Sequence, residues 1–159
     1  MTDITEDLVR GLGVSSLLLD VDNTLAFHGS QTPFPGTVEW ARRLRGAGIR
    51  IILLSNNFRK RVEPFARQYG LPFVSLSLKP LPAAYRRAMC RLDVGREEAA
   101  AVGDQIFTDV VGANLTGIKS ILLVPAGREK SWSFRLRRSL EKPIRRKIRK
   151  SGSKDGPPF

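Results

Sequence analysis

Two aspartates separated by one residue directly follow an apolar run near the N-terminus. The run is Leu17 to Leu19, and the carboxylates belong to Asp20 and Asp22. In an extended chain, side chains at positions i and i+2 point to the same side. Repulsion between them raises the pKa of at least one carboxyl group unless a cation lies between them. Because Mg²⁺ prefers a few carboxylate ligands together with water and phosphate oxygens, the pair predicts Mg²⁺-dependent phosphate chemistry.

Three further groups of polar residues follow apolar runs later in the chain. They are Ser55-Asn56-Asn57, Lys79-Pro80, and Gly103-Asp104 with Asp109. Each group comes just after a predicted strand. Since ligands of open α/β sheets bind at the carboxyl ends of the strands, we expect all four groups to converge on one crevice.

The elements that must position these residues alternate between extended and helical patterns. We predict helices at about residues 4–11, 37–46, 60–69, 82–92 and 109–116, and strands at about 17–21, 49–54, 73–76, 99–102 and 120–124. The strands are continuous apolar runs, which is typical of a parallel sheet covered on both faces. The sequence therefore predicts a three-layer α/β fold with a five-stranded, mostly parallel sheet. Thr37 is the expected N-cap of its helix.

The positive charge is concentrated near the C-terminal end of the sequence. The chain has 159 residues and a formal net charge of +12, and residues 128–150 contain eleven lysines and arginines against two glutamates, a net +9. We predict a globular domain at 1–127, a basic amphipathic segment at 128–150 and a disordered tail at 151–159. Apolar residues recur every four positions in the basic segment: Trp132, Leu136, Leu140, Ile144 and Ile148.

This pattern leaves three interpretations of the basic segment open. A helix with one apolar and one cationic side can bind an anionic membrane surface. The same helix can pack its apolar side on the domain. A cationic segment can also bind nucleic acid, for example RNA or the ribosome.

The remaining composition favours a cytoplasmic protein, with peripheral association at the inner membrane face as an added possibility. No apolar run approaches the ~20 residues needed to cross a bilayer. The N-terminal residues are acidic rather than basic, which argues against a secretory signal. Cys90 is the single cysteine, so no intrachain disulfide is expected. We expect Cys90 in or near the core, Trp40 in the core or beside the loop that covers the site, and His28 in solvent without a catalytic role.

The motifs resemble those of a known superfamily. Asp20-Val21-Asp22-Asn23-Thr24, Ser55, Lys79 and the segment from Gly103 to Asp109 match, in order, the four motifs of the haloacid dehalogenase superfamily. The similarity covers about residues 14–126. More narrowly, the chain resembles the YqeG-type phosphatases of subclass IIIA, a group similar to phosphatidylglycerophosphate phosphatases.

The first motif supplies the groups for phosphoryl transfer. Asp20 can attack phosphorus as a nucleophile and form an aspartyl-phosphate. Asp22 can protonate the leaving alkoxide and later deprotonate the attacking water. The resemblance implies that the backbone carbonyl of Asp22 joins Asp20 and Asp104 as ligands of Mg²⁺, and that Asp109 orients Asp104 or a bound water without binding the ion itself.

The other motifs are expected to hold the phosphoryl group. Ser55 and the backbone at Asn56 can bind phosphoryl oxygens, and Thr24 helps to position them. Lys79 supplies positive charge against the charge that develops during transfer.

Motif spacing bears on the substrate. Asp22 and Ser55 are 33 residues apart and Ser55 and Lys79 are 24 apart, which leaves no room for an inserted cap domain. We therefore expect an open site suited to a large or membrane-presented phosphomonoester, with phosphatidylglycerophosphate as one candidate. The alternative is a haloacid dehalogenase-like module with little catalysis that binds RNA or the ribosome through residues 128–150. The sequence predicts no particular oligomeric state.

Overall fold

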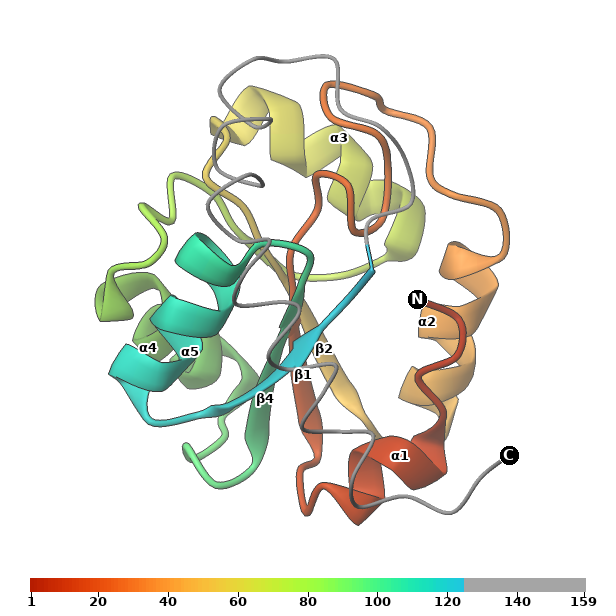
Figure 1. The fold of residues 1–159 in the computed structure, drawn as a ribbon. Coiled ribbons are helices and arrows are strands. Elements are labelled where there is room, and N and C mark those ends of the chain that lie inside the picture. Colours follow the sequence, from red (N-terminus) through yellow and green to blue (C-terminus); the bar gives the residue numbers. More distant parts are fainter. Residues whose placement is uncertain (125–159) are drawn as a thin grey trace. The chain divides into compact units, whose positions relative to one another are not determined.

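The computed structural model describes residues 1–124, which form a parallel sheet between two layers of helices (Figure 1). The strands are β1 (Ser16–Leu19), β2 (Arg50–Leu54), β3 (Phe73–Val74), β4 (Ala99–Gly103) and β5 (Lys119–Leu122). The helices are α1 (Glu6–Gly11), α2 (Thr37–Gly46), α3 (Arg59–Tyr69), α4 (Pro82–Leu92) and α5 (Val111–Thr116), and the π-helical turn η1 (Ile106–Val110) precedes α5. The predicted three-layer α/β architecture is confirmed.

Alternate residues of the central strands face opposite layers. Leu17 and Leu19 of β1 belong to the core beneath α1, α2 and α3, whereas Leu18 belongs to the core beneath α4 and α5. The neighbouring β2 alternates in the same way. Because both faces of each central strand are buried, the strands appear in the sequence as unbroken apolar runs.

The strand order places the ends of β1 and β4 side by side. The order is β3-β2-β1-β4-β5 with every neighbouring pair parallel. The chain moves outward from β1 to β3 and then returns to the other side of β1. Leu19 is in register with Val102, so the residues that follow both strands emerge at the same level. Ligands of doubly wound sheets bind at such a reversal of strand order.

Several local expectations are corrected by the structure. Thr37 is the first residue of α2 rather than its cap, because Gly36 holds the cap position with φ of 77° and the Thr37 hydroxyl donates to the Phe34 carbonyl at 2.7 Å. Cys90 is exposed, because α4 buries Ala84, Tyr85, Ala88 and Met89 on its inner side. The strand predicted at 73–76 ends at Val74.

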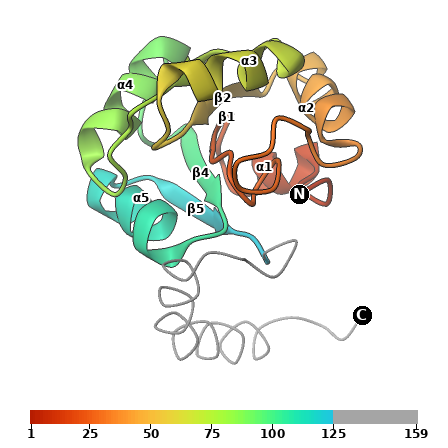
Figure 2. The ribbon, with the colours of Figure 1, turned by 90° about the horizontal axis from the view of Figure 1, so that it is seen from above.

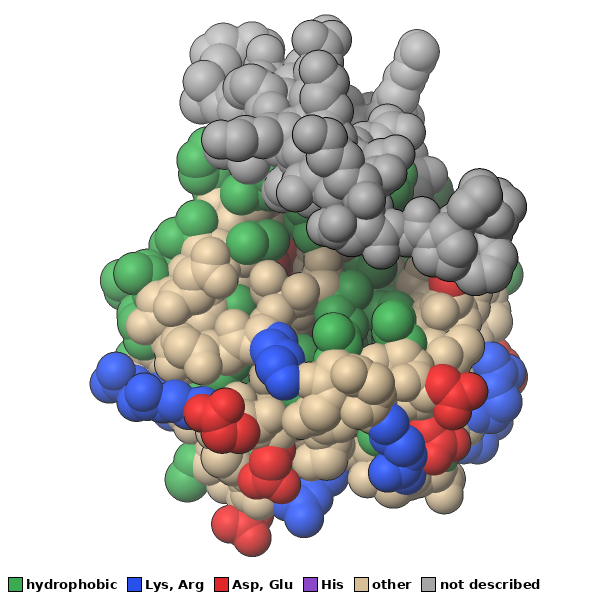
Figure 3. All heavy atoms as spheres, turned by 60° about the horizontal axis from the view of Figure 1, so that its bottom comes forward, with side chains coloured by type: hydrophobic (Ala, Val, Ile, Leu, Met, Phe, Trp, Pro, Cys, Tyr) green, Lys and Arg blue, Asp and Glu red, His purple; other side chains and the backbone are tan. Residues whose placement is uncertain are grey.

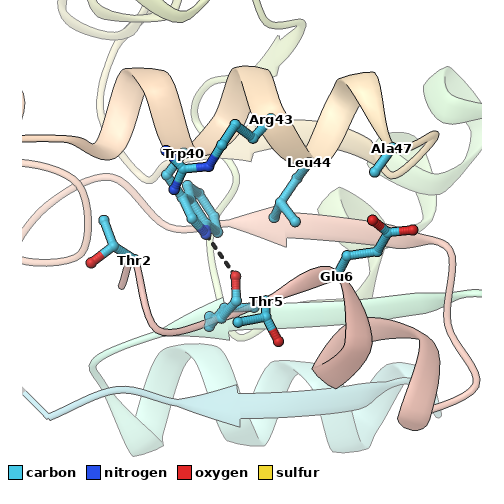
Figure 4. Close-up of a pocket in the computed structure, with 8 residues that line it drawn as sticks. Thr2, Thr5, Glu6, Trp40, Arg43, Leu44 and Ala47 are labelled. Atoms are coloured by element: carbon cyan, nitrogen blue, oxygen red, sulfur yellow. Dashed lines mark hydrogen bonds between the residues drawn. The ribbon is translucent and has the colours of Figure 1, made fainter.

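Trp40 lies in the core, as expected, and connects α2 to the segment that precedes α1. Its side chain is 1% exposed, and the indole nitrogen donates to the Ile4 carbonyl at 2.7 Å (Figure 4). Beside the indole lies a pocket of about 240 Å³ between the N-terminal segment and α2. Its lining includes Thr2, Thr5, Glu6, Arg43, Leu44 and Ala47.

The basic segment 128–150 and the tail 151–159 lie outside the described residues, so the predictions made for them stay predictions. Among residues 1–124, none of the helices has the length and apolar character that crossing a bilayer requires.

Candidate active site

Three buried carboxylates meet at the carboxyl ends of β1 and β4. Asp20 directly follows β1, Asp104 directly follows β4, and Asp109 lies in η1. One carboxylate oxygen from each lies within 4.8 Å of the others. The backbone N–H of Asp20 donates to the Val102 carbonyl at 2.9 Å, which fixes the first aspartate against the fourth strand. The structure therefore brings together three of the acids expected from the sequence.

Gly103 makes the approach of Asp109 possible. A Cβ atom at residue 103 would overlap the carboxylate of Asp109. The same carboxylate accepts a hydrogen bond from the backbone N–H of Gln105 at 3.2 Å. Asp109 therefore folds back onto the end of β4, and its second oxygen accepts a hydrogen bond from Nζ of Lys79.

Lys79 lies between two of these acids. Its Nζ is 2.5 Å from Oδ1 of Asp20 and 2.6 Å from Oδ1 of Asp109, and all three side chains are buried. Since residues 75–81 connect β3 to α4, this ammonium joins the outer half of the sheet to the β1–β4 junction.

The amide of Asn56 holds the Lys79 segment in place. Its Oδ1 accepts the backbone N–H of Lys79 at 2.7 Å and the Ser77 hydroxyl at 2.6 Å. Sequence reasoning assigned Asn56 to phosphate binding, and the structure engages its side chain in positioning Lys79. Ser55 is buried, and its hydroxyl accepts the backbone N–H of Asn57 at 3.2 Å.

Asp22 lies apart from the three-acid cluster and faces the loop at residues 27–33. Its Oδ2 accepts from Nδ2 of Asn57 at 2.5 Å, and its Oδ1 accepts from the backbone N–H of Gly29 at 3.2 Å. Oδ1 also lies 3.4 Å from Nη2 of Arg61 and 3.4 Å from Nδ1 of His28. The sequence predicted Asn57 at the crevice without assigning it a role, and it did not identify Arg61. His28 is half exposed, and its contact with Asp22 was not expected.

Arg61 is the residue that joins this loop to α3. Its Nη2 donates to the Ser30 carbonyl at 2.7 Å as well as to Asp22. No spacing rule relates residue 61 to residue 22, because their contact depends on the path of the 27–33 loop. Only a three-dimensional structure reveals it.

Thr24 occupies a different place from the other expected residues. It is buried and lines a pocket of about 170 Å³ together with Asn23, Phe34 and Thr37. Its hydroxyl makes no hydrogen bond with another described residue. Thr24 therefore takes no part in the hydrogen bonds described above for Ser55, Asn56 and Lys79.

The pKa values of Asp20 and Lys79 depend on their burial and on the charges of the groups around them. Burial raises the pKa of Asp20 to about 8, with Asp109 and Asp104 adding to the rise and Lys79 opposing it. Burial lowers the pKa of Lys79, but Asp109 and Asp20 outweigh this effect and the pKa lies above its usual value. Lys79 is therefore charged, and it is the one cation that contacts this group of three carboxyl groups within the described residues.

A divalent cation fits this cluster of three acids. Oδ2 of Asp20 is buried and accepts no hydrogen bond within the described part of the chain. Buried carboxylate oxygens without donors are costly unless a proton or a cation binds them. All the groups that could bind a metal ion here are carboxylate oxygens, and Mg²⁺ prefers oxygen ligands.

The chain is similar in sequence to known proteins. A family model described as haloacid dehalogenase-like hydrolase matches residues 3–117. The chain is 31% identical over 149 residues to "Probable phosphatase YqeG" of Bacillus subtilis, covering 94% of this chain and 87% of that protein. It is also 31% identical over 97 residues to a phosphoserine phosphatase of Thermus thermophilus, covering 55% of this chain and 39% of that protein.

Solved structures share the fold. A haloacid dehalogenase-like hydrolase from Brucella suis superposes with a TM-score of 0.58 at 12% identity, covering 77% of this chain and 92% of the other. A p-nitrophenyl phosphatase from Archaeoglobus fulgidus gives a TM-score of 0.57 at 16% identity, covering 76% and 90%. At these identities the likeness concerns the fold alone.

Proposed function

The chain belongs to the haloacid dehalogenase-like hydrolase family and is a phosphatase of the YqeG type, and from this premise we propose that it is a Mg²⁺-dependent phosphomonoesterase that works through an aspartyl-phosphate. The observation that carries the proposal is the buried cluster in which Lys79 lies between Asp20 and Asp109 beside Asp104. Folding alone gains little from so many like charges in one place.

In the first half of the reaction, a carboxylate oxygen of Asp20 attacks phosphorus. The new O–P bond forms as the P–O bond to the leaving group breaks. Asp22 delivers its proton to the departing alkoxide oxygen. Its contacts with Asn57 and Gly29 fix the direction of that carboxyl group.

In the second half, water attacks the phosphorus of the aspartyl-phosphate. Asp22, now ionised, takes a proton from that water, and Asp20 leaves as a carboxylate. The products are the alcohol and inorganic phosphate, and both acids return to their starting protonation states.

Lys79 supplies positive charge where negative charge develops on the transferring group. Its two carboxylate partners hold the ammonium in place before substrate arrives, so little reorganisation is needed during transfer. Asn56 contributes indirectly because it fixes the backbone of Lys79.

Asp20, Asp104 and the backbone carbonyl of Asp22 would hold Mg²⁺. Asp109 would help to position these groups without binding the ion. The ion supplies charge neutralisation and orientation of phosphate oxygens when bound. Ser55 and the neighbouring backbone would then hold the remaining phosphoryl oxygens.

The short connections favour a large or membrane-presented substrate. Within residues 1–124, one helix separates β1 from β2 and one separates β2 from β3. No folded unit inserted in these connections covers the site. Phosphatidylglycerophosphate, whose phosphate lies at a bilayer surface, is a candidate substrate on this basis.

The decisive experiment measures phosphate release from p-nitrophenyl phosphate and from phosphatidylglycerophosphate in mixed micelles. Turnover of p-nitrophenyl phosphate that requires Mg²⁺ and disappears in Asp20→Asn supports the enzyme. A wild-type protein that releases no phosphate from either ester contradicts it and favours the RNA-binding alternative. Activity that survives in Asp20→Asn removes that residue as the nucleophile.

A further inference from the structure

Six large apolar side chains are exposed on the connections that carry the catalytic residues. We call them the apolar rim: Phe27, Phe58, Leu76, Leu78, Leu81 and Phe107. All lie on connections that leave the carboxyl ends of β1 to β4, the edge seen from above in Figure 2. Phe58 and Leu78 are the most exposed of the six, at 72% and 63%. The described residues thus concentrate exposed apolar surface at the catalytic edge.

Hydrogen bonds join the four connections into one continuous surface. Asp22 of the first connection contacts Asn57 of the second, and the Asn57 carbonyl accepts the backbone N–H of Leu76 in the third at 2.9 Å. Lys79 of the third contacts Asp109 in η1, which follows β4. The rim residues are therefore neighbours of the catalytic groups in sequence and lie on segments tied to one another.

Folding does not explain the two leucines beside Lys79. Leu76 and Leu78 have φ angles of 47° and 52°. This left-handed region is unfavourable for a bulky side chain, and glycine or asparagine suits it better. Both leucines are also exposed, so their burial does not offset the strain. A role in contacting an apolar partner accounts for them.

The four connections carry no exposed acid, and the helices that begin beside them carry charges of both signs. In residues 20–36, 55–58, 75–81 and 104–110 every aspartate is buried and no glutamate occurs. Arg59 and Lys60, both exposed, follow Phe58 at the start of α3, where Arg59 forms an ion pair with Glu63. Glu39 is exposed in the first turn of α2. Further exposed acids, for example Glu97 and Glu98, lie toward the amino ends of the strands. Figure 3 looks toward that opposite end and shows acidic and basic side chains interspersed.

We propose that the apolar rim docks the catalytic edge onto the surface of an anionic lipid bilayer. Aromatic and leucine side chains next to lysine and arginine are the combination that enters the boundary between head groups and acyl chains. This inference rests on the proposed function, since docking there presents the site to phosphomonoester head groups in the bilayer.

Charge selects the bilayer over a second copy of the chain. Two copies of this chain would repel each other, because each carries a formal net charge of +12. An anionic lipid surface complements the same positive charge. The net +9 of residues 128–150 adds attraction to that surface from elsewhere in the chain.

Co-sedimentation of the full chain with vesicles of equal parts phosphatidylglycerol and phosphatidylcholine tests the proposal. Binding is measured at low salt and at about 0.5 M salt, where a Debye length well below 10 Å screens the contribution of the basic segment. The rim variant is Phe58→Ser with Leu78→Ser. The matched control is Leu8→Ser with Leu115→Ser, which removes exposed apolar side chains away from this edge without changing the charge.

We expect wild type and the control to bind at high salt, and the rim variant to partition about tenfold more weakly or worse. All three should turn over p-nitrophenyl phosphate equally, which shows that they are folded. Equal vesicle binding by all three, or none by wild type, overturns the proposal while leaving the phosphatase assignment intact. A wild-type dimer that the rim variant dissociates overturns it in favour of self-association.

Fluorescence provides an independent readout of insertion. In Phe58→Trp, the added emission should shift to shorter wavelength and be quenched by vesicles containing brominated acyl chains. In the control Leu115→Trp, the added emission should not change. Equal responses of the two variants contradict docking through the rim.

Discussion

Gly103 and Asp109 approach so closely that residue 103 has no space for a side chain. The contact turns η1 back toward β4 and sets the distance from Asp109 to Lys79. A glycine that would otherwise be assigned to a turn is thus part of the geometry of the site.

Gly103→Ala should lower kcat about ten- to a hundredfold and destabilise the protein by about 1–3 kcal/mol, because the methyl group must displace the Asp109 carboxylate. Steady-state kinetics and urea unfolding measure the two effects. The matched control is Gly46→Ala, where nothing lies within 4 Å of the added atom. If both variants behave like wild type, Gly103 has no special role.

Asp20→Asn should reduce turnover at least about a thousandfold, since the amide is no nucleophile. It should also change how stability depends on pH. The ordinary pKa of an aspartate is 3.8, whereas that of Asp20 in the folded protein is about 8, so between these values the folded state holds a proton that the unfolded chain has lost. The free energy of unfolding of wild type therefore falls as pH rises through this window.

Thermal melting in EDTA measures this dependence. The Tm of Asp20→Asn minus that of wild type should increase from pH 4 to pH 8. A difference that stays constant across the window would mean that Asp20 ionises normally in the fold.

Mg²⁺ should raise the Tm of wild type at pH 8, because a ligand that binds only the folded state stabilises it by about 2.7 kcal/mol at a hundred times Kd. Asp104→Asn should lose most of this response, and EDTA should reverse it in wild type. Glu98→Gln, which changes an exposed acid far from the cluster, should respond as wild type does. An identical Mg²⁺ response in Asp104→Asn would place the ion elsewhere.

Asn56→Ala should lower kcat about tenfold or more with a smaller effect on KM, because Lys79 loses the hydrogen bonds that fix its backbone. The exposed Asn114→Ala is the control. An effect of Asn56→Ala confined to KM would instead assign Asn56 to substrate binding, as the sequence suggested.

Arg61→Ala should lower kcat about tenfold and release the 27–33 loop, since Arg61 binds both Asp22 and the Ser30 carbonyl. Limited proteolysis of the loop measures the second effect. Lys60→Ala removes a neighbouring cation without these contacts and should do neither. Unchanged kinetics and proteolysis in Arg61→Ala would show that the loop is held by other contacts.

The sequence was informative about the site residues that lie at the carboxyl ends of the strands. Asp20, Lys79, Asp104 and Asp109 could be predicted to meet because parallel strands end at one edge, and the structure places them together. The surroundings of Asp22 could not be predicted, because they depend on how the loop folds back onto α3. Motif position alone identifies the acid, but it does not identify the donors around it.

The spacing of apolar residues in a helix predicts their burial only when it is known which side of the helix faces the sheet. The expected burial of Cys90 was wrong because one turn of α4 presents Met89 to the sheet and Cys90 to solvent. Leu76 and Leu78 look like ordinary apolar residues in the sequence, and their unusual backbone angles appear only in the fold.

The strand order divides the acids between two stretches of chain. Asp20 and Asp22 come from the first, while Asp104 and Asp109 come from the second, and the exposed Gly95 lies between them. A cut at that glycine would yield two pieces, each lacking acids that the other contains. Reassembly of the two pieces would then be detected as restored hydrolysis. The molecule could therefore be made into a split reporter whose signal requires β4 to pair with β1.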